Sequence, residues 1–266
     1  MHALIVKKPR DTGPMELRDF GPTGRRLGTA ADCVEDSRWE LHRGELWEQM
    51  GSKDVHGIVI ALLAALFRTH ARSDVTVMSD VYCDLSDSDA ASLRAPDVAL
   101  VTGLTKPKDD FFRGTPIIAV EVRGTQSKKY LEEKVKLYLE HDWPCTWIVH
   151  TERQEVEVVR PGVASVVYTR AGAPVPLVPE LDAHGLRALP VAAFFEDMEA
   201  RRFNDDWVAA RVEAQAVLTV LGARGLGIDA RVRARVLATQ DHAALGRWLV
   251  LAATAPSSEA FVAGME

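Results

Sequence analysis

Three charged residues stand beside apolar segments where charge is costly. Asp97 immediately precedes a run of four apolar residues, Glu121 immediately follows another, and Lys134 lies on the apolar arc of a helical segment. Buried charges normally pair with one another or hold a metal. Two acids at strand ends and a lysine aimed at the sheet would suit a metal-dependent phosphodiesterase. The alternative is a buried ion pair that only fixes the register of the strands.

The elements that would position these side chains form an α/β pattern. Apolar runs predict strands at 98–101 and 117–122, and the spacing of Leu131, Val135 and Tyr138 predicts a helix over 128–141. A hairpin is predicted over 38–50, a helix over 54–70 and a strand over 74–85, and three further short strands at 146–149, 155–159 and 165–169. Because each strand is too short to stand alone, we expect one mixed sheet flanked by helices.

The remaining segments divide the chain. Residues 1–28 are rich in Gly, Pro and basic residues and are expected to form a loosely ordered leader before an α/β domain at 29–173. A Pro-rich link at 174–179 precedes a helical C-terminal module, 180–266. Its predicted helices are 191–202, 206–222, 228–238, 242–253 and a short one after Ser257.

Composition limits the class of protein. Hydrophobic content of 47% and charged content of 26% are typical of a globular protein. Three widely spaced cysteines indicate neither a zinc site nor a disulfide framework, and the longest apolar run, Ile58 to Phe67, is too short to cross a bilayer. We therefore expect a soluble cytoplasmic protein that binds no membrane. The net charge of −6 is unlike that of a nucleic-acid binder, although residues 94–136 hold nine basic and six acidic residues.

Six pieces of sequence, in order, resemble a known family. Segment 38–46 resembles its YELIDGEL hairpin, and His56 its histidine at the start of a helix. The other four resemble its RPDVAVV strand (94–101), its VVEV strand (118–122), its DLGEKLALY helix (131–138) and its VPEYWIV segment (143–149). Residues 29 to 170 thus resemble the Uma-type restriction endonucleases of the PD-(D/E)XK nuclease superfamily.

The resemblance implies a restriction-endonuclease-like fold and a nuclease acting on DNA. Asp97 and Glu121 would hold Mg²⁺ or Mn²⁺, Glu45 would complete the acidic pocket, and Lys134 would replace the superfamily lysine, displaced from strand to helix. Mg²⁺ prefers carboxylate and water oxygens, which suits two acids. Four residues near the glutamate strand would contact the nucleic acid: Arg123, Gln126, Lys128 and Lys129.

Departures from the family pattern favour a second hypothesis. The usual E-x-K reads Glu121-Val122-Arg123, and arginine cannot accept a proton. The family's SPST loop is replaced by 124–127 and its aspartate after YWIV by His150. The alternative is a catalytically weak or inactive nuclease-fold protein that binds nucleic acid or a protein partner.

Several assignments keep simpler alternatives. Glu45 is equally compatible with a solvent-facing hairpin residue, and His56 more often bonds the backbone at a helix start than acts in catalysis. Gln126 fits a loop-surface residue. The C-terminal segment resembles a helical module found downstream of some transposon-associated nucleases and could dock a protein partner. The sequence does not decide between a monomer and a homodimer.

Overall fold

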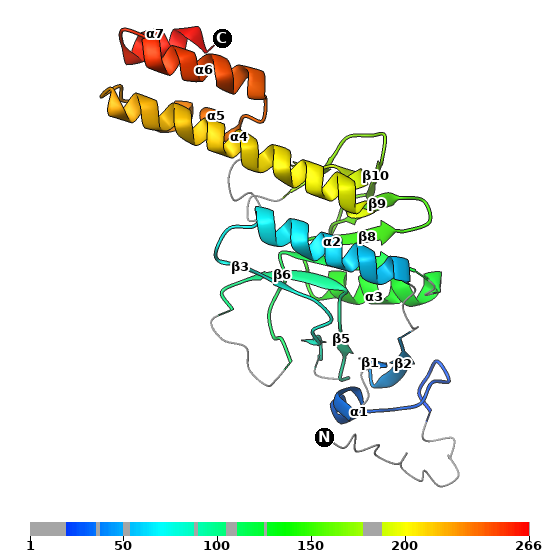
Figure 1. The fold of residues 1–266 in the computed structure, drawn as a ribbon. Coiled ribbons are helices and arrows are strands. Elements are labelled where there is room, and N and C mark those ends of the chain that lie inside the picture. The colour runs from blue at the N-terminus through cyan, green and yellow to red at the C-terminus, as the bar shows by residue number, and fades with distance from the viewer. Residues whose placement is uncertain are drawn as a thin grey trace, which may run out of the picture.

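The computed structural model describes residues 20–35, 38–49, 54–87, 90–104, 111–124, 127–177 and 188–265. Gln126 and the predicted leader up to residue 19 lie outside this part of the chain. No helix in the described ranges combines the length and the apolar character that crossing a membrane requires. Figure 1 shows a sheet-containing region in the middle, the N-terminal hairpin at one end and a group of helices at the other.

The central element is a six-stranded mixed sheet in the order β10-β9-β8-β7-β6-β3. Strands β7 and β8 are parallel, and each of the other neighbouring pairs is antiparallel. The parallel pair requires a crossover, which helix α3 (Lys128–Glu140) provides. The strands are β3 (Val75–Met78), β6 (Val98–Thr102), β7 (Ile118–Arg123), β8 (Thr146–His150), β9 (Glu155–Val159) and β10 (Val166–Thr169).

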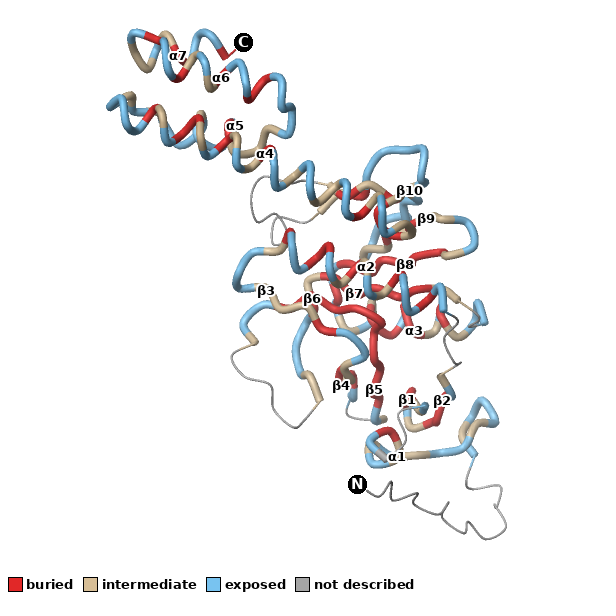
Figure 2. Tube along the Cα trace, viewed as in Figure 1, coloured by how far each residue is buried: buried red, intermediate tan, exposed pale blue. Residues whose placement is uncertain are grey.

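Successive side chains of each strand point to opposite faces of this sheet, and the two faces pack against different helices. Ile118, Val120 and Val122 of β7 pack in the main core with helix α2 (Asp54–His70), whereas Ala119 packs with Leu137 of α3. Glu121 shares the parity of Ala119 and therefore faces α3. The central strands β6, β7 and β8 are almost entirely buried, whereas β10 at the edge of the sheet is mainly exposed (Figure 2).

A second, four-stranded sheet has the order β2-β1-β5-β4. The hairpin turn consists of Arg43 and Gly44, both at positive φ (49° and 79°), as a type I′ turn requires. Helix α1 (Ala30–Glu35) precedes the hairpin. The strands are β1 (Trp39–His42), β2 (Glu45–Glu48), β4 (Cys83–Asp84) and β5 (Leu93–Arg94).

The expectation of one sheet is therefore wrong in two places. The predicted strand 74–85 is divided into β3 and β4, because the chain turns at Asp80, whose φ is +53°. Pro96 lies between β5 and β6 and has no N–H with which to continue a ladder, so these strands belong to different sheets.

The C-terminal region begins with the small sheet β11 (Val175–Pro176) and β12 (Ala188–Leu189) and the 3-10 helix η2 (Val191–Phe194). Helix α4 (Asp197–Ala223) follows, so the predicted helices 191–202 and 206–222 are wrong in their bounds. No glycine or proline interrupts residues 197–221, and α4 continues through Asn204, whose Oδ1 lies 2.8 Å from Nε2 of His70 on α2.

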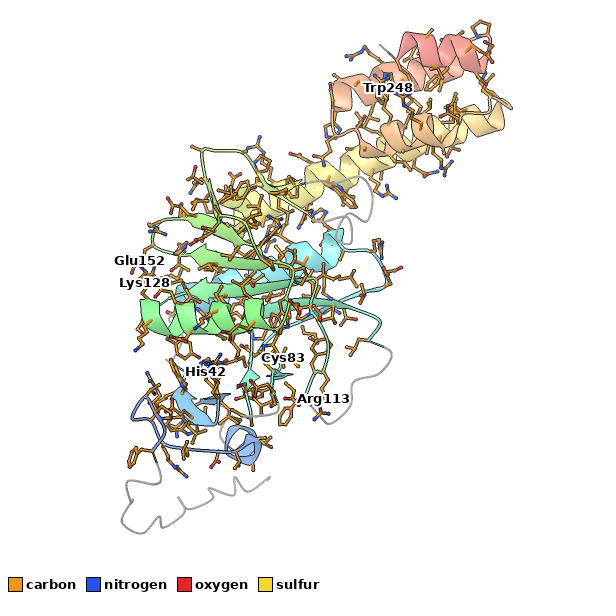
Figure 3. All side chains as sticks on the ribbon, turned by 180° about the vertical axis from the view of Figure 1, so that it is seen from behind. His42, Cys83, Arg113, Lys128, Glu152 and Trp248 are labelled. Carbon is orange, nitrogen blue, oxygen red and sulfur yellow. The ribbon has the colours of Figure 1, made fainter. Side chains whose placement is uncertain are left out.

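Two cores meet along α4. Ala200 near its start packs in the main core, whereas Ala214 and Val217 pack with the later helices. We call the second half of α4 together with α5 (Ala230–Ala238), α6 (His242–Thr254) and α7 (Ser258–Gly264) the helical bundle. Trp248 in Figure 3 marks its interior.

Candidate acid–lysine site

The register of β6 and β7 brings the two predicted acids together. Val98 pairs with Val120, so the next step along the antiparallel ladder sets Asp97 opposite Glu121. The Val122 amide donates a hydrogen bond of 2.5 Å to Asp97 Oδ2, which fixes the aspartate against the neighbouring strand. Both side chains are buried. The predicted convergence of these strand ends is what the structure shows.

Helix α3 supplies the partners of Glu121. Ser127 caps the helix by accepting a hydrogen bond from the Tyr130 amide. Lys134 and Tyr138, four residues apart and so on one face, point at the sheet. Lys134 Nζ lies 3.0 Å from Glu121 Oε2, and the Tyr138 hydroxyl donates to Glu121 Oε1 over 2.7 Å. Lys134 thus extends from helix α3 toward the sheet and contacts Glu121, as its place on the apolar arc predicted.

A third acid, Glu40 of β1, was missed by the sequence reasoning. Its Oε1 lies 3.0 Å from Lys134 Nζ and accepts from the Ala95 amide at 2.9 Å. Its Oε2 accepts from Arg94 Nη1 at 2.8 Å and from the Tyr130 hydroxyl. The side chains of Glu40 and Arg94 are fully buried. We call Glu40, Arg94, Asp97, Glu121 and Lys134 the acid–lysine cluster.

Burial and the neighbouring charges shift the pKa values of Glu121, Glu40 and Lys134. Burial, reinforced by the Asp97 and Glu40 carboxylates, raises the pKa of Glu121 to about 8, against the opposing effects of Lys134 and Tyr138. Although burial opposes it, the pKa of Glu40 is lowered to about 2 by Lys134 and Arg94. Burial alone would lower the pKa of Lys134, but the neighbouring carboxylates raise it well above its usual value. Lys134 is therefore an ammonium ion at neutral pH.

The donor set fits a hard cation. Three buried carboxylates face two basic side chains in the cluster, so full ionisation of the acids leaves an excess of negative charge. Within the described ranges, no three His, Cys, Asp or Glu residues are arranged to hold a metal by themselves. Mg²⁺ is commonly bound by one or two carboxylates and completed by water and phosphate oxygens. Asp97 and Glu121 meet that requirement.

His56, in the first turn of α2, closes the side of the cluster next to Asp97. Its Nε2 lies 3.3 Å from Asp97 Oδ1, and its side chain and that of Asp97 are about one-tenth exposed, more than those of Glu40 or Glu121. The hydrogen bond to Asp97 raises the pKa of His56, although burial opposes the shift. The histidine thus contacts a carboxylate, rather than only the backbone at the helix start.

Glu45 is not brought to the acid–lysine cluster. It is buried, but its Oε1 accepts from the Thr23 amide at 2.8 Å and its Oε2 accepts from the Thr23 hydroxyl at 2.6 Å. Glu45 therefore ties part of the expected loose leader to β2, and Leu27 also forms a bridge with it. Glu40, five residues earlier on the paired strand, takes the position near Lys134 that was expected of Glu45.

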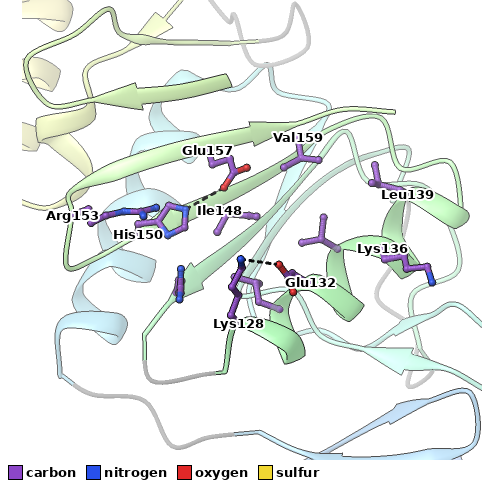
Figure 4. A pocket seen from close by; sticks show the side chains of 12 residues that line it. Lys128, Glu132, Lys136, Leu139, Ile148, His150, Arg153, Glu157 and Val159 are labelled. Carbon is purple, nitrogen blue, oxygen red and sulfur yellow. Dashed lines mark hydrogen bonds and ion pairs between the residues drawn. The ribbon is translucent and has the colours of Figure 1, made fainter. Parts of the chain in front are cut away.

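The predicted nucleic-acid contacts lie at the end of the sheet where α3 begins. Arg123 is half-buried, Lys128 and Lys129 are exposed, and Lys128 pairs with Glu132 at 3.4 Å. Figure 3 labels Lys128 at this end of the sheet. Arg123 and Lys128 line one cavity of about 640 Å³ between α3 and strands β8 and β9. We call this cavity the α3–β8 groove (Figure 4).

Comparisons with known proteins agree with this fold. The family model Uma2, described as "Putative restriction endonuclease", matches residues 32–192. The chain is also similar to the crystal structure of "a putative nuclease belonging to DUF820" from Anabaena variabilis ATCC 29413. Identity is 17% and the TM-score 0.50, over 59% of this chain and 89% of that chain, which supports the fold. No curated protein matches. Because the family model spans more than half of the sequence and includes the whole acid–lysine cluster, the chain belongs to the Uma2 family.

Proposed function

We propose that this protein is a Mg²⁺-dependent endonuclease that hydrolyses phosphodiester bonds in DNA, with Mn²⁺ able to replace Mg²⁺. The observation that carries the proposal is Lys134 Nζ held 3.0 Å from Glu121 Oε2, while Asp97, immediately before β6, lies opposite Glu121 in the register of β6 and β7. Membership of a family described as "Putative restriction endonuclease" supports the same reaction class.

The residues of the cluster have distinct roles in this proposal. Asp97 and Glu121 would hold the cation, which when bound offsets charge on phosphate oxygens and lowers the pKa of an attacking water. Lys134, kept protonated by its acidic neighbours, acts as an electrostatic stabiliser of the charged transition state and not as a proton acceptor. Glu40 positions Lys134, because its Oε1 lies 3.0 Å from the ammonium that also contacts Glu121.

Supercoiled plasmid offers a direct test. We expect the wild type to nick it with Mg²⁺ or Mn²⁺ and Asp97→Ala to be inactive. Lys134→Met leaves the Glu40 and Glu121 carboxylates without a shared cation, so its melting temperature should fall below that of the wild type. At a temperature where the variant is folded, it should cut about 100-fold more slowly, the scale for one lost stabiliser. Arg247→Met, which removes an exposed positive charge from helix α6 outside the cluster and the groove, is the control and should cut normally.

The readouts are single-turnover cleavage and the melting temperature with Mg²⁺. A folded Lys134→Met protein that cuts at the wild-type rate would remove Lys134 from the mechanism. Equal nicking by wild type and Asp97→Ala would remove the metal site.

A second function has an observation of its own. Both oxygens of Glu121 already have protein partners, and arginine replaces the lysine usual at position 123. These features favour a nuclease-fold protein that binds nucleic acid or a protein without cutting. Calorimetry with Mg²⁺ separates the two. For an endonuclease we expect binding to wild type and none to Glu121→Gln, whereas binding that survives the substitution favours the second function.

A further inference from the structure

The α3–β8 groove has two chemically different ends. Figure 4 shows His150 and Arg153 at one end and Leu139 and Lys136 at the other. The first end adjoins a smaller cavity of about 160 Å³, lined by Arg123, His150 and Arg153 among others. This cavity lies where the parallel strands β7 and β8 finish, the edge at which α/β sheets commonly bind ligands.

The basic end has cationic donors that can bind an anion. Lys128 is paired with Glu132 at 3.4 Å and Arg153 with Glu155 at 2.9 Å. Arg123 has no ion-pair partner in the described part of the chain, and its guanidinium can clamp a phosphate with two hydrogen bonds. Arg123 is also two residues from Glu121 on the same face of β7, so a phosphate held here is adjacent to the proposed reaction centre.

The other end is apolar. Leu131, Val135 and Ile148 form a small core cluster under the groove, against which Leu139 and Val159 pack while remaining partly exposed. The groove therefore joins a phosphate-sized basic cavity to an apolar floor in one volume of about 640 Å³, within the usual size of small-molecule sites.

We propose that the α3–β8 groove binds an unpaired nucleotide of the substrate strand, with its phosphate at Arg123 and Arg153 and its base on the floor around Ile148 and Leu139. In a duplex the faces of the bases are stacked and cannot reach an apolar floor, whereas an unpaired base exposes both faces. The substrate class is thus DNA that is single-stranded beside the cleaved bond. This inference rests on the proposed nuclease function.

Fluorescence anisotropy on the full-length protein tests the proposal without cleavage. The protein carries Asp97→Ala, and the probes are a labelled 12-nucleotide thymidine strand, a 12-base-pair duplex and free thymidine monophosphate as competitor. We expect the single strand to bind about tenfold or more tightly than the duplex, and the monophosphate to compete only weakly, because a strand makes several phosphate contacts.

Variants assign the binding to the groove. Arg123→Ala with Arg153→Ala should weaken strand binding about tenfold and reduce the log–log salt slope by about 1.4, the value for two phosphate contacts on a single strand. Leu139→Glu should weaken strand binding and leave the salt slope unchanged. Arg201→Ala, an exposed arginine of α4 paired with Asp197, is the control and should bind as the parent does.

Four results would overturn the proposal: no strand binding, equal or tighter duplex binding, a monophosphate that binds as tightly as the strand, or groove variants with parental affinity. The outcome is separable from that of the proposed function. A wild type that nicks plasmid while the groove variants bind strands normally would end only the groove proposal. Groove-dependent strand binding by a wild type that never cuts would end only the nuclease.

Discussion

The sheet-containing region and the helical bundle both bury apolar side chains, but they treat charge differently. Within the described residues, the buried charged side chains are Glu40, Glu45, Arg94, Asp97, Glu121 and Lys134, and all precede β8. The core of the bundle consists of Ala, Val, Leu, Trp, Phe and Met side chains. Desolvating ions is expensive, so a fold that only needed stability would be expected to resemble the bundle. The comparison therefore separates a region that keeps buried charges from one whose described core is apolar.

Of the changes considered, removing Glu40 should lower the free energy of unfolding the most. Glu40→Ala leaves Arg94 without its ion-pair partner and removes one of the two carboxylate partners of Lys134. Breaking a buried ion pair in this way costs about 3–5 kcal/mol. Urea unfolding measures the loss. Glu48→Ala, an exposed acid of the same hairpin, should change the stability by less than about 0.5 kcal/mol. A similar small change for Glu40→Ala would mean that the buried charges are not coupled.

The stability of the sheet-containing region should depend on pH through His42. Burial and the nearby Arg94 lower the pKa of His42 to about 4, so the folded protein keeps this ring neutral while the unfolded chain protonates it below about pH 6.5. Stability from this site is complete above pH 6.5 and is lost as the pH falls toward 4. His42→Phe, which retains the edge-on ring contact with Trp47, should remove this loss.

The measurement is the free energy of unfolding at pH 7 and pH 5. Between these values the wild type should lose about 2 kcal/mol more than His42→Phe. Equal losses would show that His42 is protonated alike in the folded and unfolded states.

The smallest expected effect lies in the bundle. Asp229 caps α5 by accepting from the Val232 amide at 2.7 Å. Asp229→Ala should cost about 1 kcal/mol, whereas Asp229→Asn, an equally good cap, should cost little. Nicking by Asp229→Ala should match the wild type, because the bundle holds no residue of the cluster. Reduced cleavage in a folded Asp229→Ala protein would contradict the separation of the two regions.

The sequence predicted the site best where a charge interrupts an apolar run. Asp97, Glu121 and Lys134 each stand out in this way, and the structure places all three together. Glu40 was missed because alternation in a four-residue strand with Trp39 and Leu41 suggests a solvent-facing acid. Its burial depends on Arg94 and Lys134, which are 54 and 94 positions away and leave no mark in the local pattern.

The strands themselves were predictable from the local sequence pattern. The pairing of strands that are far apart in the sequence was not. The strands from β6 to β10 follow from their apolar periodicity. Their separation from the hairpin sheet depends on Pro96 and on pairing between distant segments. The continuity of α4 depends on contacts with α2 that stabilise its polar middle, which residue propensities do not reveal.

Helix α4 connects the main core to the core of the helical bundle. Its 27 residues make a rod of about 40 Å whose first part is embedded in one core and whose last part is embedded in the other. His70 at the end of α2 grips this rod through Asn204, Phe203 and Trp207, and His56 at the opposite end of α2 touches Asp97. A continuous series of contacts therefore runs from the bundle along α4 to α2, and from α2 to the carboxylate of Asp97.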